Sequence, residues 1–158
     1  MGNIEHNDII GNYKIKGKVL TLEAIAEQFY FTSIIPQPFL LMGKPDQPYC
    51  DKLMYGKCFS MAIVMQKAIG GTIVNAFIIS SVSEDSTDLT LVPHGIIIKD
   101  NKIIDPINHH AHPGSEIPYL IPKRIRKPKL SKLIVCNYIT LTKDKFNTLF
   151  PTYINKII

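Results

Sequence analysis

The spacing of hydrophobic residues along this chain changes at Gly71. Before that point, apolar residues recur at three- and four-residue intervals over 21–31 and again over 58–69, the spacing of amphipathic helices. Thr21 is suited to cap the first of these helices through its hydroxyl. The pair Gly70-Gly71 is suited to end the second helix, since glycine readily adopts the left-handed conformation found after helices.

Two stretches in the first half of the chain follow neither a helical nor a strand pattern. Residues 1–20 mix glycine, asparagine and lysine, and we expect them to form a lead-in segment. The segment Pro36–Tyr55 contains four prolines. We predict a loop there, lying over the beginning of the second helix.

After Gly71 the chain is rich in β-branched residues and predicts strands joined by polar turns. Asp100-Asn101 is a typical tight-turn pair, so the segments on either side should form a hairpin. We expect 106–115 to be a loop and Thr142 to cap a final helix over 143–149. The predicted strands are 72–82, 89–92 with 94–99, 102–105, an edge strand at 119–125, and 133–141.

The order of these elements predicts an α+β fold in a single domain spanning 1–158. A helical first third precedes four or five largely antiparallel strands, so the helix over 58–69 should pack on a small sheet. A chain of 158 residues is long enough to build one hydrophobic core.

Charge and hydropathy narrow the class of protein. The net charge of +5 is too small for a dedicated nucleic-acid binder, and no apolar run approaches the roughly 20 residues of a membrane helix. The N-terminus lacks the pattern of a signal peptide. Basic residues concentrate over Lys123–Lys132, which we interpret either as a solvated loop or as a docking patch for an acidic partner or a membrane surface.

The chain has three cysteines, Cys50, Cys58 and Cys136. An odd, low count argues against a disulfide framework and favours a reducing compartment. Cys58 stands apart from the other two because it follows Gly56 and begins a helix. Backbone N–H groups and the helix dipole at that position favour the thiolate, which is the nucleophilic form of cysteine.

His94 and Asp105 are the candidate partners of Cys58. His94 begins the apolar run H-G-I-I-I, and Asp105 ends the run I-I-D-P on the other arm of the predicted hairpin. The two are unequally distant from the turn, so they can meet only through a bulge at Gly95 or as a diagonal pair. A thiolate, an imidazole and an orienting carboxylate are the parts of a cysteine hydrolase.

The order G-x-C-F-S-M-A, then H-G-I-I-I, then I-I-D-P resembles the papain-like and transglutaminase-like cysteine superfamily. In style it is similar to the small deamidase or protease domains of bacterial toxins and effectors. The resemblance covers Tyr55–Ile107. It implies a papain-like core in which Cys58 is the nucleophile, His94 the general base and acid, and Asp105 the orienting residue.

The resemblance also implies an oxyanion hole made by the Cys58 backbone N–H and an upstream donor. Gln47 is the candidate for that donor, and Tyr55 and Gly56 are candidate substrate-binding residues. The implied activity is deamidation of a glutamine in a target protein by a monomer without cofactor or metal. The implied location is secretion or delivery into a target cell, with a cytoplasmic location as the alternative.

Three other interpretations stay open. The same triad would serve a protease or a transglutaminase, because all of these enzymes form an acyl-enzyme. A non-catalytic interaction domain with a basic docking face would leave Cys58 buried. His109, His110 and His112 could bind metal, but they lack a recognised ligand spacing, and one of them could instead replace His94 as the base.

Overall fold

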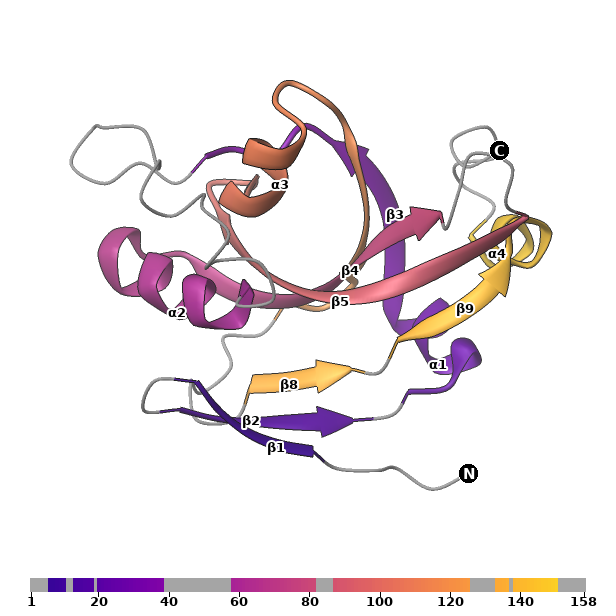
Figure 1. The fold of residues 1–158 in the computed structure, drawn as a ribbon, viewed down its shortest axis with the longest axis horizontal. Coiled ribbons are helices and arrows are strands. Elements are labelled where there is room, and N and C mark those ends of the chain that lie inside the picture. The colour runs from indigo at the N-terminus through magenta and orange to yellow at the C-terminus, as the bar shows by residue number, and fades with distance from the viewer. Residues whose placement is uncertain are drawn as a thin grey trace.

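A computed structural model describes residues 6–10, 13–18, 20–38, 58–81, 87–125, 133–136 and 138–150. Side chains are described within these ranges except for 6–10, 13–18, 58–60, 110 and 133–136. The described part of the chain is an α+β structure whose strands form a curled, mainly antiparallel sheet and a smaller three-stranded sheet (Figure 1). No helix in these ranges is long and apolar enough to cross a membrane.

The first predicted helix is shorter than expected. Helix α1 spans Leu22–Gln28, with the Thr21 hydroxyl accepting a hydrogen bond from the Ala24 N–H as predicted. The chain then turns directly into strand β3, Phe29–Ile34. The sequence F-Y-F-T-S-I explains why the helix ends earlier than predicted, because aromatic and β-branched residues favour a strand over the continuation of a helix.

The second predicted helix lies where its apolar spacing indicated. Helix α2 spans Cys58–Ile69 and ends at Gly70 and Gly71, whose φ angles are 79° and 86°. These left-handed conformations are the ones that glycine supplies at a helix end. The chain then enters β4, Thr72–Ser81.

The predicted hairpin is confirmed, with one continuous first arm. Strand β5 spans Asp88–Lys99 and runs through Pro93 without a break, and β6 spans Lys102–Ile104. Asp100 and Asn101 join the two strands with φ angles of 52° and 60°. Two consecutive positive φ values are the mark of a type I′ turn, which the Asp-Asn pair adopts at little cost.

Two elements after the hairpin differ from the prediction. The expected loop contains a short helix α3, Pro106–Ala111, with Asp105 as its N-cap. An Asp-Pro pair at N-cap and first helical position is a recognised helix start, and this signal was missed. Strand β7, Ile117–Pro122, pairs with both β3 and β4, so it is a central strand and not an edge strand.

Both ends of the chain also carry strands that were not predicted correctly. The expected lead-in contains β1, His6–Ile10, and β2, Tyr13–Lys18. The expected long strand is divided into β8, Leu133–Cys136, and β9, Ile139–Thr142, which belong to different sheets. The final helix α4, Lys143–Leu149, and its cap Thr142 are confirmed.

The larger sheet has the strand order β3-β7-β4-β5-β6, and β9 pairs with the first residues of β5. Beyond the end of β3, Gln37 forms a β-bridge to Ile104 of β6. The chain that continues from one edge strand, β3, therefore pairs with the opposite edge strand, β6. The sheet therefore curls around an interior, with α3 at one opening and α2 outside the curl (Figure 1). β1, β2 and β8 form a separate sheet, and its strand β8 lies next to β4 and β5 of the curled sheet.

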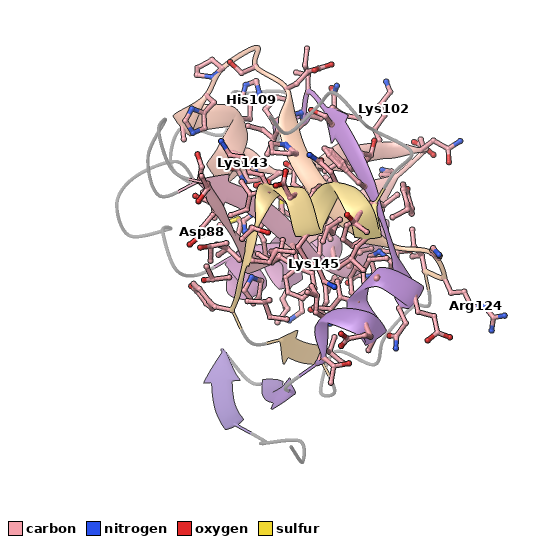
Figure 2. The ribbon with its side chains drawn as sticks, turned by 90° about the vertical axis from the view of Figure 1, so that its right-hand side faces the viewer. Asp88, Lys102, His109, Arg124, Lys143 and Lys145 are labelled. Atoms are coloured by element: carbon pink, nitrogen blue, oxygen red, sulfur yellow. The ribbon has the colours of Figure 1, made fainter. Side chains whose placement is uncertain are left out.

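Because side chains alternate along strands, the two faces of the curled sheet hold separate clusters. Tyr119, fully buried, belongs to the inner cluster, and Phe77, also fully buried, belongs to the outer one. Figure 2 shows α4 lying against the sheet, where Phe146 joins the outer cluster. The inner cluster consists of Val74, Ala76, Ile96, Ile103, Ile117, Tyr119 and Ile121.

Contacts at the end of α2 show which face of β5 its C-terminal end approaches. The Lys99 ammonium donates a hydrogen bond of 2.6 Å to the Ile69 carbonyl oxygen. A Cβ at Gly71 would lie 2.8 Å from Cγ2 of Ile97. Ile97 and Lys99 share one face of β5, opposite the face of Ile96, so the end of α2 packs outside the curl.

Candidate functional site

His94 and Asp105 meet as the hairpin predicted. His94 Nε2 lies 2.9 Å from Asp105 Oδ2, and both side chains are buried. Ile97 pairs with Ile104 in the β5–β6 register, so Asp105 follows opposite Ile96 and contacts His94 diagonally. The β4–β5 register runs without interruption through Gly95, so the diagonal pair, and not a bulge, makes the contact.

Two hydrogen bonds of its backbone and one of its side chain hold Asp105 in place. Its N–H donates to the Gln37 carbonyl oxygen at 2.9 Å, and its carbonyl oxygen accepts from the His109 N–H at 3.0 Å. Its Oδ1 accepts from the Asn108 N–H at 3.3 Å as the N-cap of α3. The carboxylate is therefore fixed by the junction of a strand, a covering segment and a helix start.

Two further donors, neither of them expected from the sequence, bind Asp105 Oδ2, the oxygen that faces His94. The Tyr119 hydroxyl donates to Asp105 Oδ2 at 2.7 Å, and the Asn108 amide donates to it at 2.7 Å. Asn108 could have been found from the capping pattern, since it follows the N-cap Asp105 by three residues. Tyr119 had no such signal because its contact depends on β7 lying beside β4.

The surroundings of Asp105 control its ionisation. Burial alone raises the pKa of its carboxyl, but attraction to the charged form of His94 and the hydrogen bonds from His94, Asn108 and Tyr119 outweigh burial. The net pKa of Asp105 is lowered from its ordinary value of 3.8. The pKa of Tyr119 is raised by burial and by the neighbouring Asp105 charge, so its hydroxyl stays protonated and remains a donor.

An ionised Asp105 fixes the proton position on a neutral His94. A carboxylate only accepts hydrogen bonds, so the bond between Nε2 and Oδ2 requires the proton on Nε2. In the neutral ring, Nδ1 then carries the lone pair. The imidazole can therefore take a proton at Nδ1 while Asp105 stabilises the resulting positive charge.

The third member of the predicted triad is placed by its backbone alone. Cys58 is the first residue of α2, as predicted, and its side chain lies outside the described residues. Gln47, Tyr55 and Gly56 also lie outside them. His94 lies on the face of β5 opposite Ile97 and Lys99, the residues that approach the C-terminal end of α2.

The histidine-rich segment follows Asp105 on α3 and its C-cap. His109 lies on α3, where Figure 2 shows it near the top of the molecule, and its Nδ1 is buried without a hydrogen-bond partner in the described part of the chain. His112 is the C-cap residue and is exposed. Among the described residues, no cluster of three or more histidine, cysteine or acidic side chains could hold a metal ion.

The predicted basic patch is described only at its beginning. Lys123 and Arg124 follow β7 and are exposed, and Figure 2 shows Arg124 pointing away from the body of the molecule. Residues 126–132 of the run lie outside the described residues.

Comparison of the chain with protein-family models, curated proteins and solved structures finds no match.

Proposed function

We propose that the protein is a cysteine hydrolase of the papain-like and transglutaminase-like type that deamidates glutamine side chains of a target protein. The observation that carries the proposal is the 2.9 Å contact between His94 Nε2 and Asp105 Oδ2. That contact joins the two residues expected to assist Cys58, and Cys58 itself begins α2. The proposed site needs no cofactor and no metal.

The proposed reaction proceeds in two halves. Nδ1 of the neutral His94 takes the proton of the Cys58 thiol, and the resulting thiolate attacks the glutamine carboxamide carbon. The C–N bond then breaks as protonated His94 gives this Nδ1 proton to the leaving nitrogen, releasing ammonia. His94 then takes a proton from water, which attacks the thioester carbon and displaces the thiolate. The net change is glutamine plus water to glutamate plus ammonia.

Asp105 would act in both halves without touching the substrate. It holds the His94 ring by Nε2 and stabilises the positive charge that appears each time Nδ1 takes a proton. Its lowered pKa keeps it ionised over the whole neutral range. We further propose that the target is a protein of another cell, reached by secretion or delivery, and that the basic residues from Lys123 onward help to bind it.

Intact-mass spectrometry of target-cell proteins incubated with the enzyme tests the proposal. Deamidation adds about one mass unit per glutamine, whereas hydrolysis of a peptide bond or crosslinking to an amine changes the mass far more. We expect the one-unit increase with the wild-type protein and none with Cys58→Ala or His94→Ala. An increase that persists in Cys58→Ala would refute the mechanism.

A second candidate function is a non-catalytic interaction domain, and the packing of α2 favours it. The end of α2 lies outside the curl, whereas the His94 side chain belongs to the inner face of β5. In this interpretation His94, Asp105, Asn108 and Tyr119 form a satisfied polar core that stabilises the fold. Normal unfolding behaviour together with an unreactive Cys58 would support this second function over the first.

A further inference from the structure

Asp105 Oδ2 accepts hydrogen bonds from three side chains that come from three different elements. His94 is on β5, Asn108 is on α3 and Tyr119 is on β7, with distances to Oδ2 of 2.9, 2.7 and 2.7 Å. Tyr119 is fully buried, and Asp105 is 1% exposed. Hydrogen bonds to a buried carboxylate are short and strong because the acceptor is charged and water is excluded.

We propose that Tyr119, with Asn108, is a positioning residue that fixes the orientation and protonated nitrogen of His94 by holding the Asp105 carboxylate. The inference rests on the proposed function for its chemical purpose, because a hydrolase of this kind needs Nδ1 unprotonated in the resting imidazole. Neither residue touches the reacting atoms in this account. Tyr119 acts through Asp105, and Asn108 acts through Asp105 and through its amide nitrogen, 3.4 Å from His94 Nε2.

The geometry explains why Asp105 alone would hold His94 less firmly. A carboxylate with one partner can rotate about its own side-chain bonds and present either oxygen. Here the Asn108 N–H binds Oδ1, while the Tyr119 hydroxyl and the Asn108 amide bind Oδ2. Each carboxylate oxygen therefore has its own donors, which oppose rotation of the carboxylate. The oxygen that faces His94 is therefore always Oδ2, and the ring is held with Nε2 toward it.

The residues near His94 come from β4, α3 and β7. β4 places Ala76 opposite His94, and α3 contributes Asn108, whose amide nitrogen is also 3.4 Å from Nε2. Among the titratable side chains that the structure describes on neighbouring elements, Asp105 binds His94 directly and Tyr119 binds Asp105, while His109 lies on α3 and Lys102 on β6. The Tyr119 hydroxyl remains protonated because burial and the Asp105 charge raise its pKa.

Nitrogen NMR of the His94 ring tests the inference in the full-length protein. In the wild type we expect the neutral ring to be protonated on Nε2 and that proton to exchange slowly with solvent. Tyr119→Phe keeps the ring but removes the donor, so exchange should quicken about tenfold and the Nδ1-protonated tautomer should appear. Tyr138→Phe makes the same chemical change at an exposed tyrosine and should leave His94 unchanged.

Asn108→Ala is a second variant that should change His94 in the same direction. Wild-type nitrogen shifts and exchange in both Tyr119→Phe and Asn108→Ala would overturn the inference. Site-resolved alkylation of Cys58 in the same samples separates this from the proposed function. If Cys58 of the wild type is alkylated as slowly as an ordinary thiol while Tyr119→Phe alters the His94 ring, the hydrolase proposal is refuted. If Cys58 of the wild type is alkylated rapidly while Tyr119→Phe leaves the His94 ring unaltered, the positioning role is refuted.

Discussion

At the residue scale, hydrogen bonds to both of its oxygens constrain the Asp105 side chain. It is buried, charged, and bonded through both oxygens to His94, Asn108 and Tyr119. A buried charge is tolerated only when it is paired and hydrogen-bonded, and those partners in turn depend on it. Asp105 is thus expected to matter for folding as well as for the proposed chemistry.

Replacement of Asp105 should therefore destabilise the protein. Asp105→Ala leaves the Tyr119 hydroxyl and the Asn108 amide buried without their acceptor, and we expect a loss of about 3 kcal/mol or more in the free energy of unfolding. Urea denaturation measures this loss. Asp144→Ala, which removes a carboxylate from the first turn of α4, is the control and should cost less than about 1 kcal/mol.

The lowered pKa of Asp105 predicts the direction of its pH dependence. The folded-state pKa lies below the ordinary value of 3.8, so the unfolded chain binds the proton more readily than the folded protein. The stabilisation is fully present above 3.8 and is lost as the pH falls through the folded-state pKa. Denaturation at a series of acidic pH values should show a drop in unfolding free energy that is smaller in Asp105→Asn. Equal drops would contradict the assignment.

At the element scale, Gly71 sets how closely α2 and β4 approach β5. A Cβ at this position would lie 2.8 Å from Ile97 Cγ2 and 3.0 Å from the Ile98 carbonyl oxygen, and the φ angle is 86°. Gly70 has a similar φ of 79° but nothing within 4 Å of the same position. Substitutions at these two glycines therefore allow the cost of backbone strain to be measured separately from the cost of steric overlap.

Gly71→Ala should cost more than Gly70→Ala by the energy of that overlap. We expect about 1 kcal/mol for Gly70→Ala from left-handed strain alone, and about 2–4 kcal/mol for Gly71→Ala from strain plus overpacking. Parallel urea titrations of the two variants measure the difference. Equal losses would show that α2 does not approach β5 as closely as described.

The elements also show what the sequence could and could not predict. The Asp100-Asn101 turn, the Thr21 and Thr142 caps and the Gly70-Gly71 helix end follow from local chemistry, and all are confirmed. The division of 133–141 into β8 and β9 depends on which strands lie alongside, which is not a local property. The α3 start was available in Asp105-Pro106 and was missed.

At the scale of the whole molecule, the contact between His94 and Asp105 was predictable because one hairpin carries both residues. The Tyr119 contact was not, because it requires β7, which follows the hairpin in the chain, to lie beside β4. The bridge from Gln37 to Ile104 likewise joins distant segments, and it positions the Asp105 backbone. Long-range pairing thus supplied the parts of the site that local pattern could not.

The proposed function requires His94 to activate Cys58. The most direct test is the rate of alkylation of Cys58 as a function of pH, resolved by mass spectrometry, in the wild type and in His94→Ala. An ordinary thiol ionises near pH 8.5, so we expect wild-type Cys58 to react well below about pH 8, and much faster than Cys136. His94→Ala should return Cys58 to the ordinary profile. A wild-type Cys58 that reacts no faster than Cys136, or one unaffected by His94→Ala, would contradict the account.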